Sequence, residues 1–190
     1  MVEKIVVGPL EENCYIVYEE KNSVLIDPGD EAEKILSRIK SLNVDLLAIF
    51  LTHGHYDHIG AVEAIRKKTK APVYCSEKEK ELLFNPALNL SEDPPISLIP
   101  DHTFSDGDEV RVKDMEFRFM LTPGHTLGSA VIFYGDELFT GDTLFFGGYG
   151  RTDLPTGDMG EMRKSLRRLL SLEKNYNVYP GHGPLSKIRR

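Results

Sequence analysis

The chain has 190 residues, of which 41% are hydrophobic and 28% are charged, a composition typical of a soluble globular protein. A chain of this length can bury a substantial core, and we expect residues 1–190 to form a single domain. The formal net charge of −7 argues against a nucleic acid as the main partner, because such binding depends on basic patches. No run reaches about 18 apolar residues, and the N-terminus lacks the apolar core of a secretion signal. We therefore expect a cytoplasmic protein without a membrane partner, whose oligomeric state the sequence leaves open.

The N-terminal half alternates predicted strands with helices. Short strands are expected over residues 5–7, 15–18 and 24–26. Asp30 then suits the N-cap of a helix, because apolar residues follow at helical spacing. The continuous apolar run 46–51 predicts a strand that is buried on both faces. A second helix is expected over about 59–69, followed by a short strand over 72–74.

The C-terminal half repeats this order after an irregular stretch. Ser76 is expected to cap a helix that runs to about residue 84, and residues 85–100, with four prolines, are expected to be irregular and long enough to fold over a cleft as a lid. A β-rich region over 109–134, an amphipathic helix over 163–172 and a last strand over 177–179 complete the chain. Two α/β-like halves follow from this order. Cys14 and Cys75 have no motif spacing, so we expect free thiols.

The segment Thr52-His-Gly-His-Tyr-Asp-His58 carries three imidazoles and a carboxylate directly after the apolar run, at the end of a strand where α/β proteins bind ligands. His53 and His55 are two residues apart, so in an extended segment they point to the same side. Asp57 and His58 follow where the chain turns into a helix, and they approach from another direction. Imidazole and carboxylate are donors that zinc, iron and manganese accept. The segment therefore predicts a metal site with enough ligands for two ions.

Three further candidate ligands, His125, Asp142 and His182, also follow predicted strands. Each has a glycine beside it, which lets the backbone turn sharply and approach a site closely. Five of the six histidines thus lie in strand-end loops. The sixth, His102, lacks this context and is expected at the surface.

Taken together, these residues resemble the complete ligand pattern of the metallo-β-lactamase-fold hydrolases: His53, His55, Asp57, His58, His125, Asp142 and His182. The segments Gly141-Asp-Thr-Leu-Phe-Phe-Gly-Gly-Tyr-Gly-Arg151 and Pro180-Gly-His-Gly183 resemble those of the glyoxalase II-like, or hydroxyacylglutathione hydrolase-like, branch. The similarity runs over residues 13–184. It implies a four-layer αββα sandwich with metals at one edge of the paired sheets, in a short form that lacks the C-terminal helical domain.

The resemblance also implies how the ligands are divided between two divalent transition-metal ions, with zinc expected first and iron or manganese as alternatives. The first ion is assigned to His53, His55 and His125, the second to Asp57, His58 and His182, and Asp142 bridges both. A water held between the ions as hydroxide attacks a carbonyl carbon, while Asp57 orients it and accepts its proton. A thioester suits this chemistry because a thiolate leaves without a strong general acid. The implied partner is a small-molecule thioester such as S-lactoylglutathione.

The residues expected around the metals are less distinctive. Arg151 matches the basic substrate-binding position of glyoxalase II, whereas Asp153 stands where that family has an aromatic residue. Tyr149 is a candidate for the substrate pocket, although an aromatic run more often belongs to a core. Asp27 matches an aspartate that hydrogen-bonds a ligand imidazole in the family, or is simply a turn residue before Pro28. The departure at Asp153 and the missing helical domain argue against strict specificity for glutathione thioesters.

Other functions remain open at this point. Persulfide dioxygenases share the motif and the phrase Gly150-Arg-Thr-Asp153, and use one iron bound by residues matching His53, His125 and Asp142 to oxidise glutathione persulfide. Hydrolysis of another ester or a lactone is a further alternative, and a non-catalytic, metal-free binding module is the last. β-Lactam hydrolysis is not expected, because zinc β-lactamases commonly have Cys where Asp142 stands.

Overall fold

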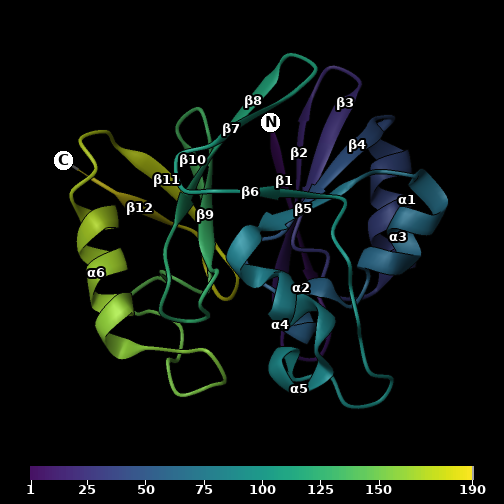
Figure 1. Ribbon diagram of the computed structural model, residues 1–190. Coiled ribbons are helices and arrows are strands. Elements are labelled where there is room, and N and C mark those ends of the chain that lie inside the picture. The colour runs from purple at the N-terminus through teal and green to yellow at the C-terminus, as the bar shows by residue number, and fades with distance from the viewer. Residues whose placement is uncertain (190) are drawn as a thin grey trace.

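A computed structural model describes residues 1–189 of the protein and contains two six-stranded mixed β-sheets that lie face to face (Figure 1). The first sheet has its strands in chain order: β1 (Val2–Val7), β2 (Glu12–Glu19), β3 (Asn22–Ile26), β4 (Asp45–Phe50), β5 (Val73–Ser76) and β6 (His102–Phe104). The second sheet also keeps chain order across its width: β7 (Glu109–Val112), β8 (Met115–Leu121), β9 (Ala130–Tyr134), β10 (Glu137–Gly141), β11 (Tyr176–Pro180) and β12 (Ser186–Ile188).

Helices cover the outer faces of both sheets. On the first sheet lie α1 (Ala32–Leu42) and α3 (Val62–Thr69), and on the second lies α6 (Met159–Leu170) (Figure 1). The shorter elements α2 (Tyr56–Ile59), η1 (Glu77–Glu79), α4 (Lys80–Phe84) and α5 (Pro86–Asn89) accompany the first sheet. The layers therefore follow the order helix, sheet, sheet, helix, which confirms the predicted four-layer αββα sandwich.

Three hydrophobic clusters fill the spaces between the layers. The first joins the outer face of the first sheet to α1 and α3, with Ile35 and Ile65 fully buried. The second lies between the sheets, where Phe50 packs edge to face against Phe117 and Phe119. The third includes Leu169 of α6 and Val131 of the second sheet. Burying apolar surface in the second cluster holds the two sheets together, and the other two clusters attach the helices to their sheets.

Parallel strands meet at the edge of the sandwich where the candidate ligands lie. The strands β3 and β4 run parallel, as do β10 and β11, so each pair ends at the same edge of its sheet. Backbone hydrogen bonds then join the two halves: Asn13 donates to the carbonyl of Gly181 at 2.7 Å, and Ala130 to that of Thr52 at 2.9 Å. The phenol of Tyr15 donates to the carbonyl of Pro180 at 2.6 Å. Loops from both sheets are thereby held against one another.

Two helix starts differ from prediction. Asp30 is not the N-cap of α1, because the cap is Glu31 in a left-handed conformation, and the Asp30 carboxylate accepts from the Glu31 backbone instead. The helix expected from about residue 59 begins earlier, as α2, and breaks at Gly60 before α3. A side chain at Gly60 would collide with the carbonyl oxygen of Gly29, so close packing of these two turns replaces a continuous helix.

The proline-rich stretch is more ordered than predicted. Residues 86–89 form α5, capped by the side chain of Asn85. The buried amide of Asn89 donates to the carbonyls of Leu83 and Ile96, at 3.3 and 2.8 Å, and ties the following loop to α4. The last helix also starts earlier than expected, at Met159, because Asp158 caps it.

Both cysteines are buried free thiols, as predicted. Among the described residues, no helix is both long and apolar enough to cross a membrane.

Candidate metal centre

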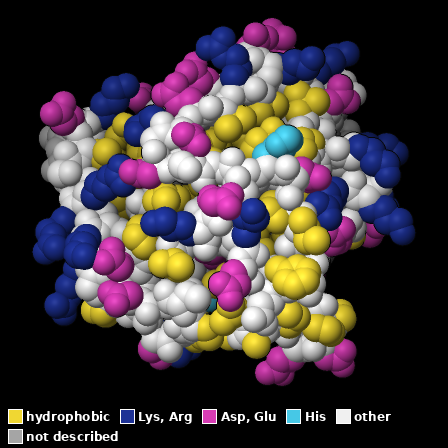
Figure 2. Space-filling view, viewed as in Figure 1, with side chains coloured by type: hydrophobic (Ala, Val, Ile, Leu, Met, Phe, Trp, Pro, Cys, Tyr) yellow, Lys and Arg dark blue, Asp and Glu magenta, His cyan; other side chains and the backbone are white. Residues whose placement is uncertain are grey.

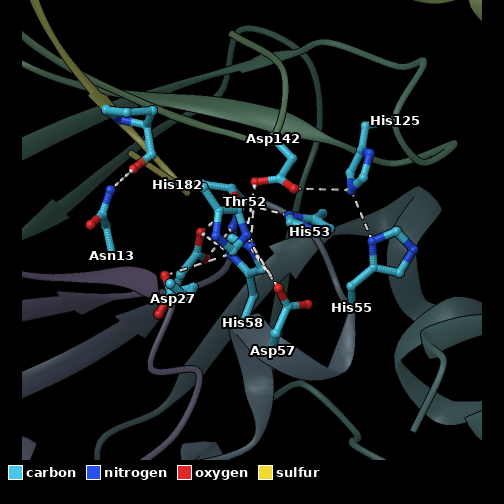
Figure 3. Close-up of polar contacts among 12 residues, drawn as sticks. Asn13, Asp27, Thr52, His53, His55, Asp57, His58, His125, Asp142 and His182 are labelled. Carbon is cyan, nitrogen blue, oxygen red and sulfur yellow. Dashed lines mark hydrogen bonds and ion pairs between the residues drawn. The ribbon is translucent and has the colours of Figure 1, made fainter. Parts of the chain in front are cut away.

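All seven predicted metal ligands lie close together at one edge of the sandwich (Figure 3). The loop after β4 and the start of α2 supply His53, His55, Asp57 and His58. The second sheet supplies the other three, from the loop between β8 and β9 (His125), the end of β10 (Asp142) and the end of β11 (His182). Residues up to 129 positions apart in the sequence thus share one site, since His53 and His182 both belong to it.

The first group of donors consists only of imidazoles, from His53, His55 and His125. One ring nitrogen of each lies within 4.8 Å of the others, and Nδ1 of His55 is 2.9 Å from Nε2 of His125. All three are buried. Burial lowers the pKa of each ring, that of His55 to about 3, so the rings stay neutral and keep a lone pair for a metal.

The second group combines Asp57 with His58 and His182, again within 4.8 Å. The Nε2 atoms of His182 and His58 lie 3.2 and 3.8 Å from Oδ2 of Asp57. Although burial opposes it, the nearby carboxylates raise the pKa of both imidazoles. Burial likewise opposes ionisation of Asp57, but His58 and His182 hold its pKa below the usual range. This group is therefore ionic, unlike the first.

Asp142 lies between the two groups, with one carboxylate oxygen toward each. Its Oδ2 is 3.5 Å from Nε2 of His125 in the first group. Its Oδ1 is 3.4 Å from Nε2 of His58 and 3.8 Å from Nε2 of His182 in the second. A carboxylate in this position can serve an ion on either side.

Four buried polar atoms of the cluster have no hydrogen-bond partner within the described residues: Nε2 of His53, His55 and His58, and Oδ1 of Asp142. Buried side-chain nitrogen and oxygen atoms are normally paired, and each unpaired one is costly. Lone pairs of neutral imidazole and carboxylate are what divalent zinc, iron and manganese bind. The residues present therefore fit divalent transition-metal ions.

Backbone carbonyls fix the outer nitrogens of two rings. Nδ1 of His125 is 2.7 Å from the carbonyl oxygen of Arg151, and Nδ1 of His182 is 3.1 Å from that of Leu10. Because a carbonyl oxygen only accepts, each Nδ1 carries a proton, and Nε2 is the nitrogen that presents a lone pair to the centre when the ring is neutral.

Asp27 lies behind His58 and Thr52, at the end of β3. Its Oδ1 accepts from the Thr52 backbone at 2.8 Å, and its Oδ2 accepts from the Thr52 hydroxyl at 2.5 Å and lies 3.1 Å from Nδ1 of His58. This contact is on the ring edge opposite Nε2. The carboxylate of Asp27 is thus placed to orient His58 and the start of the ligand loop. These contacts favour a partner of a ligand imidazole over a simple turn residue.

Sequence reasoning missed Glu79, a fully buried carboxylate in η1. Its Oε1 accepts from the backbone of Gly54 at 3.0 Å, and its Oε2 from that of Gly128 at 2.8 Å. Gly54 lies between His53 and His55, and Gly128 follows His125 by three residues, so Glu79 joins both loops of the imidazole group. Burial raises its pKa to about 7. No sequence signal separates this glutamate from its exposed neighbours in the Lys/Glu-rich stretch 77–81.

Glu12, at the start of β2, was also missed. It is 1% exposed, its Oε1 lies 3.7 Å from Nδ1 of His58, and neither oxygen has a hydrogen-bond partner among the described residues. Burial raises its pKa well above the usual value. The sequence Glu11-Glu12-Asn13 has no pattern from which this position could be inferred.

The expected substrate residues lie outside the cluster. The guanidinium of Arg151 donates from Nε and Nη2 to both oxygens of Asp153, at 2.8 and 2.7 Å, and the pair is exposed. The expectation that the aromatic run belongs to the core is wrong for Phe146 and Tyr149, which are 70% and 47% exposed, because both lie in the loop after β10 and not on a strand. Phe145 keeps one contact with the centre, its ring lying 6.1 Å from that of His182.

Comparisons with known proteins agree with this fold and cluster. The Metallo-beta-lactamase superfamily matches residues 7–182. A probable metallo-hydrolase of Streptococcus pyogenes is 40% identical over 93% of this chain and 81% of its own length. The hydroxyacylglutathione hydrolase GloC of Haemophilus influenzae is 34% identical over 98% of this chain and 92% of its own length.

Solved structures are similar over almost the whole chain. The BLEG-1 B3 metallo-beta-lactamase has a TM-score of 0.94 at 38% identity, covering 99% of this chain and 94% of that one. TTHA1623 in a di-iron-bound form has a TM-score of 0.87 at 37% identity, covering 98% and 94%. Family, identity and fold together give one conclusion: the protein belongs to the metallo-β-lactamase superfamily and is one of its metallo-hydrolases.

Proposed function

We propose that the protein is a dinuclear metal-dependent hydrolase that cleaves a thioester. The observation that carries this proposal is the position of Asp142, whose two oxygens face two separate groups of donors. One carboxylate between two such groups can serve both members of a pair of ions about 3.5–4 Å apart. The di-iron form of the similar TTHA1623 supports a count of two.

In this proposal, the imidazoles of His53, His55 and His125 hold one ion. Asp57, His58 and His182 hold the other, and Asp142 is shared. Bound ions would supply a hydroxide at neutral pH and polarise the substrate carbonyl. Zinc, iron and manganese all suit these donors.

The protein's own groups prepare the site for this reaction. Asp57 is held ionised by His58 and His182, so its carboxylate can accept a hydrogen bond from the attacking water and orient it. The carbonyls of Arg151 and Leu10 keep the protons of His125 and His182 on the outer nitrogens. In this proposal, Asp57 also takes the water's proton as the tetrahedral intermediate collapses.

Among the ester classes, a thioester needs the least help from the protein to release its leaving group. A thiolate departs without a strong general acid, whereas an amine or alkoxide needs one. Glu12 has the raised pKa of an acid, but it faces Nδ1 of His58, on the far edge of that ring from the ligand atom. The similarity to a hydroxyacylglutathione hydrolase supports the same class.

Two other activities have an observation in their favour. Persulfide oxidation is favoured by the phrase Gly150-Arg-Thr-Asp153, in which Arg151 and Asp153 form a bidentate pair. β-Lactam hydrolysis, which the presence of Asp142 in place of Cys argued against, is favoured by the likeness to BLEG-1. Hydrolysis of other esters or lactones would use the same centre.

Elemental analysis of purified protein, combined with a substrate panel, tests the proposal. The panel contains S-lactoylglutathione, a thioester of an uncharged thiol, an oxygen ester, a lactone, a β-lactam and glutathione persulfide. We expect two metal ions per chain and the highest kcat/KM with a thioester. One iron per chain with oxygen uptake would establish the dioxygenase instead, and protein that neither contains nor takes up a transition metal would establish a metal-free module.

A further inference from the structure

A cavity of about 680 Å³ lies beside the second group of donors. Its walls come from four places: the turn between β1 and β2 (residues 7–10), the turn at Gly29 and Asp30, the helix α2, and the loop 90–96 after α5. Its volume is in the usual range of small-molecule sites.

The cavity reaches the candidate metal centre directly. Asp57 is one of its lining residues. Leu10 is another, and the carbonyl oxygen of Leu10 lies 3.1 Å from Nδ1 of His182. A substrate whose carbonyl is at the centre would therefore have the cavity on one side of its scissile bond.

The lining is apolar or acidic. Val7, Leu10 and Ile96 are apolar contributors, and the charged ones are all carboxylates: Asp57, Asp30, Glu92 and Asp93. The residues that line the cavity include no Lys, Arg or His. In the lower right part of Figure 2, over α4 and α5, hydrophobic and acidic side chains likewise adjoin.

Arg151, the basic residue expected to bind substrate, does not provide a free positive charge to balance the carboxylates of the cavity. Both oxygens of Asp153 accept hydrogen bonds from the Arg151 guanidinium, so the pair is formally neutral. An anionic substrate group placed there would compete with Asp153 for the guanidinium.

From these observations we propose that the cavity binds one arm of the thioester, an uncharged and partly apolar chain longer than lactoyl, and discriminates against a carboxylate or phosphate on that arm. The proposal rests on the proposed thioesterase function and names its substrate class. An anionic arm would meet the carboxylates of Asp30, Glu92 and Asp93, none of which is a proposed metal ligand. An uncharged chain would instead cover Leu10, Leu90 and Ile96.

Matched thioesters in two series test the proposal with the metal-loaded enzyme. In the acyl series, hexanoyl and adipoyl groups are carried by uncharged N-acetylcysteamine. In the thiol series, acetyl is carried by 1-butanethiol or by 4-mercaptobutanoate. We expect the carboxylate-bearing member of one series to have a kcat/KM at least about tenfold lower, equivalent to about 1.4 kcal/mol. The series that discriminates identifies which arm enters the cavity.

Two cavity variants tie the discrimination to these residues. Glu92→Lys should reduce the ratio of kcat/KM between the uncharged and the carboxylate-bearing member at least threefold. Glu81→Lys, at an exposed position of α4 outside the lining, should leave this ratio unchanged. Leu90→Trp should fill the cavity and lower kcat/KM for the longer uncharged chain, but not for the acetyl ester of N-acetylcysteamine. Phe84→Trp, at an exposed position outside the lining, is the matched control.

The possible outcomes distinguish an error in the cavity assignment from an error in the proposed thioesterase function. Thioester hydrolysis with no discrimination in either series, or discrimination that both cavity variants leave intact, would overturn the cavity assignment alone. Failure of metal-loaded protein to hydrolyse any of the thioesters would overturn the proposed function and the cavity assignment with it.

Discussion

The two groups of donors differ in charge although they lie within one cluster. The first contains three buried imidazoles whose pKa values are lowered, mainly by burial. The second contains Asp57 and two imidazoles whose pKa values are raised by carboxylates, and its His182 side chain is 25% exposed. The first group is ready to bind a cation without releasing protons, whereas the second must give up protons when a cation binds.

This difference shows how one short motif serves two chemical environments. His53 and His55 leave β4 in an extended loop and are enclosed by the body of the protein. Asp57 and His58 start α2, and Asp57 lines the cavity there. The same seven residues can thereby offer one tightly enclosed position and one position nearer the solvent.

The most severe test removes the residue that the two groups share. Asp142→Ala should lower thioester hydrolysis by more than about 100-fold and lower the content of both metals, because losing a direct ligand exceeds the 10–100-fold cost of losing an outer partner. Elemental analysis and initial rates measure both effects. Asp114→Ala, in the exposed turn before β8, is the control. Wild-type rates in the Asp142 variant would refute the shared-ligand mechanism.

A variant of the second group alone distinguishes the two positions. His182→Ala should leave about one ion per chain, because the first group keeps all three imidazoles, and kcat should fall at least about tenfold. His102→Ala, an exposed histidine outside the cluster, should change neither quantity. Loss of both ions in the His182 variant would mean that the positions are not independent.

The first group should respond to Glu79. In Glu79→Gln, only one of the backbone amides of Gly54 and Gly128 keeps an acceptor, so affinity at the first position should fall about 10–100-fold. Cobalt(II) titration followed by its visible spectrum measures the two positions separately. Glu77→Gln, on the exposed side of the same turn, is the matched control. An unchanged spectrum and affinity would remove Glu79 from the organisation of this group.

In metal-free protein, Glu79 should also make the free energy of unfolding depend on pH. Burial raises its folded pKa to about 7 from 4.5, so its contribution to stability is complete below about pH 4.5 and is lost as the pH rises through about 7. The loss is on the order of 3 kcal/mol at about 1.4 kcal/mol per pKa unit. Urea unfolding from pH 4.5 to 8 should therefore show Glu79→Gln gaining stability relative to the wild type. A constant difference would contradict this assignment.

The smallest expected effect concerns Arg151. Asp153→Asn removes the charge that neutralises the guanidinium, so the KM for an anionic thioester such as S-lactoylglutathione should fall a few-fold with kcat unchanged. A thioester of an uncharged thiol is the control substrate. If the variant and the wild type had the same KM for S-lactoylglutathione, Arg151 would be excluded from substrate binding.

The motif residues were predictable because their pattern is local or repeats at strand ends. His53, His55, Asp57 and His58 belong to one segment, and the glycines beside His125 and Asp142 mark sharp turns. The break between α2 and α3 was not predictable, since Gly60 ends α2 through contact with Gly29, which lies 31 residues earlier. The exposure of Phe146 was missed for a similar reason: whether an aromatic run is buried depends on the path of its loop.

The sequence by itself determined the types of donor and the strands that carry them, because residue identity and hydrophobic periodicity are local properties. Only the tertiary structure decided which oxygen of Asp142 faces which imidazole, that Glu79 connects two ligand loops, and that a cavity without basic side chains adjoins Asp57. Each of these depends on packing between distant parts of the chain, where burial sets pKa values and orients hydrogen bonds.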